Sequence, residues 1–458
     1  MKRLVIAVLV LLHVSDAHAH VNNPDVYFEG NAGPYTLFVT IRTPQVIPGV
    51  ATIEIRGPAD VDHVTVVPMR LSGPGSEHPP APDVADRAPD GTYTASLWLM
   101  EHGALQVRIV VAGARGPGRL SVPVPAYAQT TLAMPRVLGF VLFGLMSLLA
   151  LAIVAIVIGA LREAALEPGV EPRKRYRIAS VIVFSAVAGL IVLGNMWWTS
   201  VADDYDRMVM RPWQIEPHVT GCTLTLPQVK ADLLPDHGHD MHLFLVRMPA
   251  LDRLAHLHPQ RTPEGGFTQP LPALPAGHYK VYADIVLTTG FPITGVAELD
   301  LPDLASCSAP TGDDSTWSGE PTPDVTARWQ GPTTVRAGEP QRLEIHVLDH
   351  GLDAKLEPYM GMAAHAEIVR TDGAAFAHIH PNGSVAMPAL ELAQPEMAMT
   401  MSMPMAHANM PGMVMPDAPI SPILKFPYGF PQPGAYKVFV QFKIAGVVHT
   451  AVFDVRVE

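Results

Sequence analysis

The sequence predicts a mainly β protein with three immunoglobulin-like β-sandwich domains and two transmembrane helices. Three observations support this prediction. Short runs of alternating apolar and polar residues, separated by Gly and Pro, recur through most of the 458 residues. Two long apolar blocks without charged side chains interrupt these runs. A pattern of His, Met, Gly and Tyr residues occurs twice in the C-terminal half.

The first 19 residues have the pattern of a secretory signal peptide. Two basic residues precede an apolar run at 4–12, and residues 17–19, Ala-His-Ala, form a small-x-small cleavage sequence. We therefore expect residues 1–19 to be removed on export, so that the mature chain begins at His20.

Residues 20–130 are predicted to form the first β-sandwich. Apolar and polar residues alternate in segments separated by Gly- and Pro-rich turns, at residues 35–42, 51–56, 92–98 and 105–111. A period of two residues places alternate side chains on opposite faces of a strand. An antiparallel sandwich, in which each sheet buries one face, explains this pattern.

The two long apolar blocks are predicted to cross a membrane as helices. Residues 137–161 and 178–198 contain no charged side chain, and each block is long enough to span about 30 Å of hydrocarbon. The segment between them, 162–177, is rich in Arg and Lys and is predicted to be a cytoplasmic loop. Both β-rich parts then lie in the periplasm, outside a bacterial inner membrane. Because the spans contain no ionisable residue, we expect them to anchor the protein.

The C-terminal half contains an internal duplication. Residues 205–305 and 324–458 carry the same features in the same order, and a Ser-, Pro- and Asp-rich linker at 306–323 separates them. Each copy has a block of His or Met, a short apolar run, a His-x-His-Pro sequence and a Gly-x-Tyr-Lys-Val sequence. We predict that each copy, repeat 1 and repeat 2, forms an immunoglobulin-like β-sandwich.

Imidazole and thioether groups exchange places between the two repeats. His237 aligns with Met360, and two residues later His239 aligns with Met362. Both groups are neutral donors to soft or borderline metals, above all copper. The exchange therefore predicts copper binding, with zinc as an alternative because three imidazoles also suit that ion. A second alternative is that the histidines stack and form hydrogen bonds inside the sandwich without metal.

The candidate ligands surround the His-x-His-Pro sequences, whose two histidines share one face of a strand and can bind one ion together. The candidates in repeat 1 are His237, His239, Met241, His242, His256 and His258. The candidates in repeat 2 are Met360, Met362, His365, His378 and His380.

Repeat 2 also contains a Met-rich insertion at about residues 386–420. Eight methionines fall within 19 residues there, and thioethers bind Cu(I) without competition from protons. The candidate ligands of the insertion are Met397, Met399, Met401, Met403, Met405, His407, Met410, Met413 and Met415. The alternatives are a low-complexity loop without metal and a buffer against oxidants.

The predicted mature N-terminus offers one more candidate ligand. If cleavage follows Ala19, the amine and the imidazole of His20 can chelate Cu(II) together. The alternative is a histidine that lies beside the cleavage site without a role in metal binding.

Cys222 and Cys307 are the two cysteines of the sequence, and they bracket repeat 1. In an oxidising compartment they are predicted to form a disulfide. The alternative is a pair of free thiols that bind metal, which we disfavour because neither cysteine lies beside a histidine cluster.

Charge and motifs exclude several classes of function. A net charge of −12 without a long basic run argues against nucleic acid as a partner. The sequence lacks Gly-x-Ser-x-Gly, Cys-x-x-Cys, His-Glu-x-x-His and a phosphate-binding Gly/Lys motif. We therefore expect a protein that is not an enzyme, and a copper-dependent oxidase is the least favoured interpretation.

The first soluble region resembles bacterial YtkA-like and CopC-like periplasmic sandwich domains. The resemblance rests on the Ala-His-Ala-His-Val sequence ending at Val21, on Pro34-Tyr-Thr-Leu-Phe-Val-Thr-Ile, and on Pro48-Gly. It implies copper binding with an N-terminal His ligand, which His20 matches. The repeated pattern of Met-His-Leu-Phe-Leu-Val-Arg and His-Leu-His-Pro resembles uncharacterised bacterial membrane proteins with two spans.

Together these features predict a membrane-anchored periplasmic protein that binds copper and captures, transfers or sequesters it. The expected partners are the membrane and a second copper protein that gives or receives the ion. The alternative is a structural or accessory protein of an envelope complex, in which the sandwiches are docking modules and the histidines bind no metal.

Overall fold

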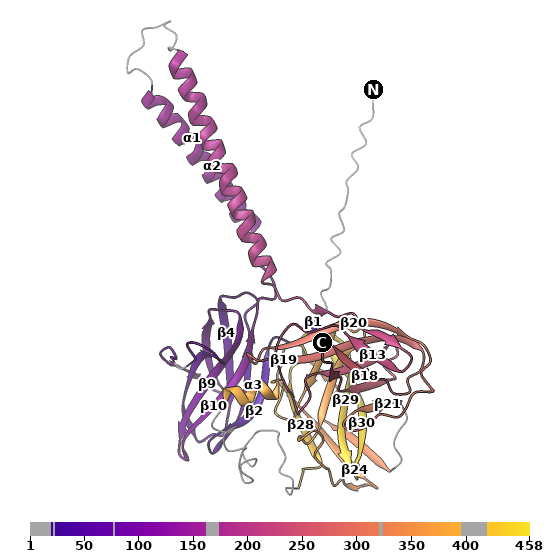
Figure 1. Cartoon of the computed structure of the whole chain (residues 1–458). Coiled ribbons are helices and arrows are strands. Elements are labelled where there is room, and N and C mark those ends of the chain that lie inside the picture. The colour runs from indigo at the N-terminus through magenta and orange to yellow at the C-terminus, as the bar shows by residue number, and fades with distance from the viewer. Residues whose placement is uncertain (1–19, 22, 77, 162–173, 320–323, 395–418) are drawn as a thin grey trace, which may run out of the picture. The chain divides into compact units, whose positions relative to one another are not determined.

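The computed structural model describes residues 20–21, 23–76, 78–161, 174–319, 324–394 and 419–458 (Figure 1). The chain divides into two compact units. One unit comprises Met1–Ala126 with Pro212–Glu458, and the other comprises Tyr127–Arg211. The first unit holds six β-sheets, which pair into three sandwiches. The predicted fold class, mainly β with immunoglobulin-like sandwiches and two long apolar helices, is confirmed.

The N-terminal sandwich consists of two antiparallel sheets. One sheet has the order β2 (Val26–Ala32), β3 (Tyr35–Arg42), β4 (Gly49–Arg56), β8 (Tyr93–Leu99) and β7 (Asp86–Arg87). The other has the order β10 (Gly116–Ala126), β9 (Gly103–Gly113), β5 (Val61–Arg70) and β6 (Asp83–Val84). Inward residues such as Val39, Ile53 and Val107 are fully buried between the sheets, as the alternation predicts.

Repeat 1 forms the second sandwich. Its larger sheet contains β11 (Trp213–Gln214), β20 (Pro292–Leu301), β19 (Gly277–Leu287), β15 (His242–Met248), β16 (Leu254–Leu257) and β21 (Ser315–Trp317), with β14 (Leu233–Leu234) beside β19. Its smaller sheet contains β12 (His218–Thr220), β13 (Thr223–Leu226), β18 (Phe267–Pro270) and β17 (Gln260–Arg261).

Repeat 2 forms the third sandwich. Its larger sheet contains β1 (His20–Val21), β27 (Ala375–Ile379), β26 (His365–Arg370), β29 (Gly434–Ile444), β30 (Val447–Val457) and β23 (Thr334–Val335). Its smaller sheet contains β22 (Val325–Gln330), β24 (Gln341–Asp349), β25 (Leu352–Asp353) and β28 (Ile423–Tyr428). A short helix, α3 (Met387–Ala393), follows β27 and lies against β10 of the N-terminal sandwich.

The pairing of strands reproduces the duplication. In repeat 1, β15 pairs with both β16 and β19, and β19 pairs with β20. In repeat 2, β26 pairs with both β27 and β29, and β29 pairs with β30. The four strands of each set therefore correspond, and the His-x-His-Pro sequences begin on β16 and β27.

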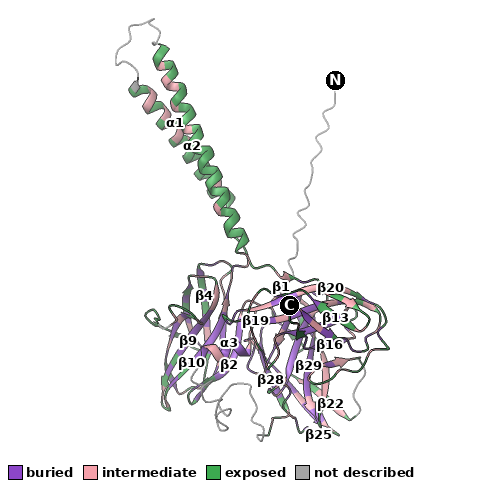
Figure 2. Cartoon of the chain, in the orientation of Figure 1, coloured by how far each residue is buried: buried purple, intermediate pink, exposed green. Residues whose placement is uncertain are grey.

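The larger sheets of the two repeats pack against each other. Phe244, Val246 and Tyr282 of repeat 1 form a buried apolar cluster with Phe376 and Phe439 of repeat 2. The rings of Tyr282 and Phe376 stack with centroids 4.1 Å apart. The strands β15 and β26 are consequently buried on both faces, and the neighbouring strand β29 is also mostly buried (Figure 2). Side chains that would face water in a lone sandwich face the other repeat here.

The second unit contains two helices that are long and apolar enough to cross a membrane, α1 (Arg136–Leu161) and α2 (Lys174–Arg207). Their surfaces are exposed within the chain (Figure 2). Helix α2 is longer than the predicted span, 178–198. It begins at Lys174, so the end of the predicted loop at 162–177 is helical, because a helix continues through charged residues once they lie outside an apolar span.

The linker between the repeats is also more ordered than the composition suggests. Residues Ser315–Trp317 form β21, which adds an edge strand beside β16. Cys307 forms the predicted disulfide with Cys222, with the two Cα atoms 5.7 Å apart. The linker is thus tied to repeat 1 by a covalent bond and by a strand.

We predict that replacing both Cys222 and Cys307 by Ser lowers the stability of repeat 1 by about 2–5 kcal/mol, because the bond closes an 85-residue loop. The measurement is thermal unfolding of the purified full chain, with Ser308→Ala as the control. The unreduced wild type should give no reaction with a thiol reagent. Two reactive thiols in that protein would contradict the prediction.

Candidate metal centre

Equivalent turns precede β15 and β26. In repeat 1, Asp236 and His239 exchange two backbone hydrogen bonds of 2.8 and 3.0 Å, and His237 has a φ of 51°. In repeat 2, Tyr359 and Met362 exchange the same two bonds, and the residue equivalent to His237 has a φ of 50°. The predicted exchange of His for Met therefore occurs at matching positions of one turn.

Eight histidines from these turns and strands gather where the two larger sheets meet. Each has at least one other imidazole centroid within 5.3 Å. They are His237, His239, His242, His256 and His258 of repeat 1, with His365, His378 and His380 of repeat 2. Period-two alternation explains the gathering, because His242 lies two residues before the interface residue Phe244.

The structure mixes the ligands of the two repeats, whereas the sequence pattern predicts one set within each repeat. Two groups of three histidines bring one ring nitrogen each to within 4.8 Å of the others. The first group is His242, His256 and His378, and we call it the inner triad. The second is His237, His365 and His380, and we call it the turn triad.

Hydrogen bonds orient two rings of the inner triad. Nε2 of His242 lies 3.1 Å from the backbone oxygen of Asp236, and Nδ1 of His256 lies 2.7 Å from Oε1 of Gln441. Both partners are acceptors, and a proton on each of these nitrogens satisfies them. In this tautomer, Nδ1 of His242 and Nε2 of His256 carry lone pairs that face each other at 3.1 Å.

The third ring of the inner triad completes this arrangement. Nδ1 of His378 lies 3.6 Å from Oδ2 of Asp284, and its buried Nε2 has no hydrogen-bond partner among the described residues. Two ligands on a tetrahedral ion with metal–nitrogen bonds of about 2.0–2.1 Å are themselves about 3.3 Å apart. The facing nitrogens of His242 and His256 are therefore spaced as ligands of one ion.

The turn triad has a similar spacing. Nε2 of His237 lies 3.3 Å from Nε2 of His380. Both ring nitrogens of His365 are buried without a hydrogen-bond partner in the described part of the chain, and so is Nδ1 of His380. His237 also forms a hydrogen bond with the backbone of Met360, which joins the turns of the two repeats.

Burial keeps these imidazoles neutral. It lowers the pKa of His237 and of His380 to about 4, and neighbouring imidazoles add to the effect. Burial also lowers the pKa of His242, His256 and His378 well below the usual value. Neutral imidazoles hold the lone pair that a metal ion requires, and protons do not compete for it at pH 7.

Three carboxyl groups surround the imidazoles, of which Asp236 and Glu367 are buried and Asp284 is partly buried. Burial raises the pKa of Asp236 to about 6 and that of Asp284 to about 7, and it raises the pKa of Glu367 well above its usual value. Glu367 is fully buried, and neither of its carboxyl oxygens has a hydrogen-bond partner among the described residues. Its Oε1 lies 3.6 Å from Nδ1 of His256, on the side away from His242. Carboxylates behind ligand histidines orient the ring and balance the charge of a metal.

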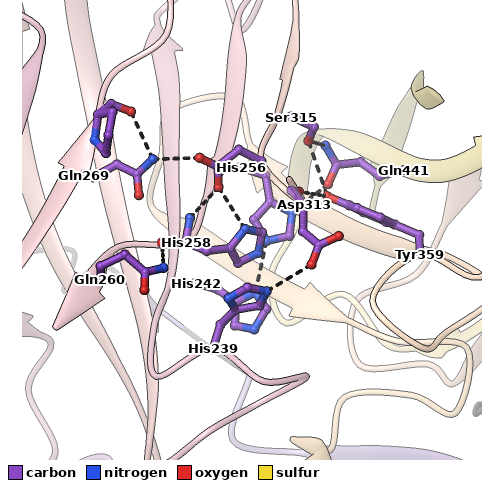
Figure 3. Close-up of polar contacts among 12 residues, drawn as sticks. His239, His242, His256, His258, Gln260, Gln269, Asp313, Ser315, Tyr359 and Gln441 are labelled. Carbon is purple, nitrogen blue, oxygen red and sulfur yellow. Dashed lines mark hydrogen bonds and ion pairs between the residues drawn. The ribbon is translucent and has the colours of Figure 1, made fainter. Parts of the chain in front are cut away.

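The centre also includes two acidic residues of the linker. His239 and His258 stack with centroids 4.0 Å apart. Nε2 of His239 lies 3.3 Å from Oδ2 of Asp313, and Nδ1 of His258 lies 3.0 Å from Oδ1 of Asp314. Figure 3 shows His239 and His258 in one group with His242 and His256, and His239 is directed toward Asp313.

Several predicted ligands lie elsewhere. Met241 packs in the apolar core of repeat 1, and Met362 packs in the core cluster of the N-terminal sandwich, so both thioethers serve as core side chains here. Met360 is partly buried in its turn and contributes its backbone to His237. The backbone of His20 pairs with Ala375 in β27. The predicted ligands of the insertion from Met397 to Met415, His407 included, lie outside the described residues.

The polar residues that support the histidines are not evident from the sequence pattern. Asp284 and Gln441 occupy corresponding positions on β19 and β29, opposite His242 and His365. Glu367 lies in an otherwise apolar run on β26, where repeat 1 has Phe244. A buried position occupied by Glu was the one signal that could have identified it.

One family of known proteins matches part of the chain. Residues 321–458, which include repeat 2, match a family described as a domain of unknown function, DUF8832. A search of curated proteins returned no match.

Solved structures similar to this chain include a tetra-tandem repeat from the extending region of a large adhesion protein. That chain shares 9% identity, and the match covers 91% of this chain and 74% of that chain, with a TM-score of 0.17. The ICAM-5 D1-D4 ectodomain fragment shares 9% identity, with 93% and 77% covered and a TM-score of 0.16. A chimeric titin Z1Z2 shares 14% identity, with 54% and 94% covered and a TM-score of 0.14. These TM-scores are too low to carry an argument about function.

We predict that Glu367→Leu stabilises the metal-free protein by about 1–3 kcal/mol, because it removes a buried carboxyl group without a hydrogen-bond partner. The same variant should gain less stability from added copper than the wild type does. Both effects are measured by denaturant unfolding of the full chain with and without Cu(II).

The control for this experiment is Glu344→Leu, which replaces a partly exposed carboxylate near Lys425 on the smaller sheet of repeat 2. A metal-free Glu367→Leu protein that is less stable than the wild type would show that the carboxyl group forms a stabilising contact.

Proposed function

We propose that this protein is a membrane-anchored periplasmic copper-binding protein that holds copper at the interface between its two C-terminal repeats. The observation that carries the proposal is the pair of ring nitrogens of His242 and His256, which face each other at 3.1 Å, with His378 in the same triad and its Nε2 without a hydrogen-bond partner among the described residues. Two facing lone pairs repel unless a cation lies between them. Burial disfavours a proton as that cation, and this supports a soft or borderline metal ion in its place.

The energetics of the metal-free centre support the same proposal. Most of the buried side-chain atoms without a hydrogen-bond partner in the described part of the chain belong to residues of this centre. Each such atom costs about 1–3 kcal/mol. Buried polar atoms without hydrogen-bond partners are expected to cluster in a folded protein where a bound ligand compensates their free-energy cost.

The donor set favours copper over other common ions. Six neutral imidazoles in two triads suit copper or zinc and not calcium or magnesium, and the nearest carboxyl oxygen is Oδ1 of Asp236, 3.3 Å from Nε2 of His237 in the turn triad. Copper(II) binds more tightly than zinc at a site of this kind. The predicted thioethers from Met397 to Met415 would extend the proposal to Cu(I).

The proposed role is capture, transfer or sequestration. Seven of the eight imidazole side chains are at most about 5% exposed, so an organic substrate has no route to them in the described structure. A centre of this kind retains an ion and exchanges it with a partner copper protein. The two apolar helices support membrane attachment, and the disulfide is typical of a protein outside the cytoplasm.

We predict that the full chain in detergent binds one Cu(II) ion at each triad. His378→Ala should remove the ion of the inner triad, His365→Ala that of the turn triad, and the double variant both. The measurement is metal analysis after dialysis, with the nitrogen hyperfine pattern of the Cu(II) electron paramagnetic resonance spectrum. His278→Ala, on the exposed part of β19, is the matched control. Copper content that is equal in the wild type and the double variant would sink the proposal.

We predict that the two β-rich parts lie on the same, outer side of the membrane. A periplasm-dependent reporter fused after Glu458 should be active in cells, and the same reporter fused after Leu161 should be inactive. Activity of both fusions, or of the second alone, would contradict the proposed orientation.

A further inference from the structure

We propose that His239, His258, Asp313 and Asp314 form a separate loading site, through which a copper ion reaches the buried triads. The inference rests on the proposed function and adds a route and a second, transient binding site to it. Its basis is the position of these four residues between solvent and the inner triad.

His239 is the most exposed histidine of the centre. Its side chain is 20% exposed, and that of Asp313 is 42% exposed. The side chains of His237 and His378 are 4% and 5% exposed, and that of His256 is fully buried. Asp284, beside His378, is also partly exposed, at 21%. Among the eight imidazoles, His239 is therefore the most accessible to water and dissolved ions.

The duplication shows why the opening lies on the repeat 1 side. Met362 occupies the position in repeat 2 that His239 occupies in repeat 1, and it is fully buried in the core cluster of the N-terminal sandwich. The backbone nitrogen of Glu29 in that sandwich donates to the backbone oxygen of Asn382, just after the second His-x-His-Pro sequence. The N-terminal sandwich thus covers the equivalent end of repeat 2, whereas the linker borders the end of repeat 1.

A continuous path of imidazoles leads inward from His239. The ring of His239 stacks on that of His258 with centroids 4.0 Å apart. The centroid of the His258 ring lies 4.9 Å from that of His242 and 4.7 Å from that of His256. His258 is buried, and its Nε2 has no hydrogen-bond partner among the described residues. Steps of this length allow an ion to bind the next nitrogen before it leaves the last, so it is never bare in a medium of low polarity.

Residues of both repeats hold the two acidic residues of the linker in place. The side chain of Asp314 accepts hydrogen bonds from the backbone nitrogen of His258 at 2.8 Å and from Nε2 of Gln269 at 2.8 Å. The hydroxyl of Tyr359, in repeat 2, donates to the backbone oxygen of Asp313 at 2.9 Å. These bonds fix the backbone and leave the carboxylate of Asp313 directed at His239 (Figure 3). Fixed negative charge at the mouth of a site raises the rate at which cations arrive.

The resulting site offers imidazole nitrogen and carboxylate oxygen, which together suit Cu(II). We assign the first contact to Asp313 and Nε2 of His239, and the inward transfer to Nε2 of His258. The loading site should therefore control how fast copper enters and leaves, and not how tightly the triads hold it.

The test is stopped-flow mixing of the full chain in detergent with Cu(II), followed by the visible absorption of the imidazole-bound ion. Cu(II) prefers imidazole nitrogen to thioether, so the Met-rich insertion contributes little signal. Asp313→Asn and His239→Ala should each slow loading, the first about threefold to tenfold and the second at least tenfold. Release to a chelator should slow by the same factor, with stoichiometry and equilibrium affinity within about twofold of the wild type.

Asp300→Asn is the matched control, because Asp300 forms an exposed pair with His278 at 2.9 Å on the same repeat, and loading should be unchanged. Lower stoichiometry or affinity at an unchanged rate would show that the four residues are permanent ligands and overturn the proposal. Wild-type rates and affinity in both variants would also overturn it. An absence of Cu(II) uptake by the wild type would instead contradict the copper function itself.

Discussion

The centre of this structure depends on one constraint, which is that polar side chains on the outer faces of two β-sheets are buried against each other. A lone sandwich solvates the outer face of each sheet. Here β15 and β26 bury both faces, so the imidazoles of His242 and His365 have no access to bulk water. Their nitrogens must find partners within the interface. The neighbouring apolar cluster around Phe376 supplies the burial energy that brings the two sheets together.

Duplication gives this interface pairs of equivalent residues. Small departures from symmetry between the repeats determine which metal-binding groups each one contributes. Asp284 of repeat 1 supports His378 of repeat 2, and Glu367 of repeat 2 approaches His256 of repeat 1. Each repeat thus supplies the carboxyl group behind a histidine of the other. The departure lies in the turns, where His237 extends across to the repeat 2 histidines and its counterpart is Met. An ion held there has ligands from both repeats, so its binding energy also stabilises their contact.

The sequence predicts the local parts of this arrangement well. Alternation predicts the strands, the charge-free blocks predict the long helices, and Cys222 and Cys307 predict the disulfide, because each depends on neighbouring residues or on a simple pairing. The alignment of His237 with Met360 predicts that the two turns are equivalent, and their dihedral angles agree.

The contacts between the repeats are not predictable from the same patterns. Period-two alternation states which residues share a face, but it does not state what covers that face. The histidines were consequently expected to act within each repeat. Met362 was expected to be a ligand for the same reason, although the N-terminal sandwich covers it. The composition of residues 306–323 predicts a linker but not the short strand Ser315–Trp317, because that strand depends on the edge of β16 for its hydrogen bonds.

Burial of the triads also bears on how the proposed copper ion would be held. A catalytic metal site keeps an open position and a path for the reactant. In the inner triad, Gln441 and the backbone of Asp236 instead orient two of the rings. The ring of Phe244 packs against that of His256, with centroids 4.4 Å apart. An ion in such surroundings leaves only by exchanging one imidazole for another. The protein would therefore determine when copper moves, through the few groups at the surface, while the buried ligands determine how much of it is retained.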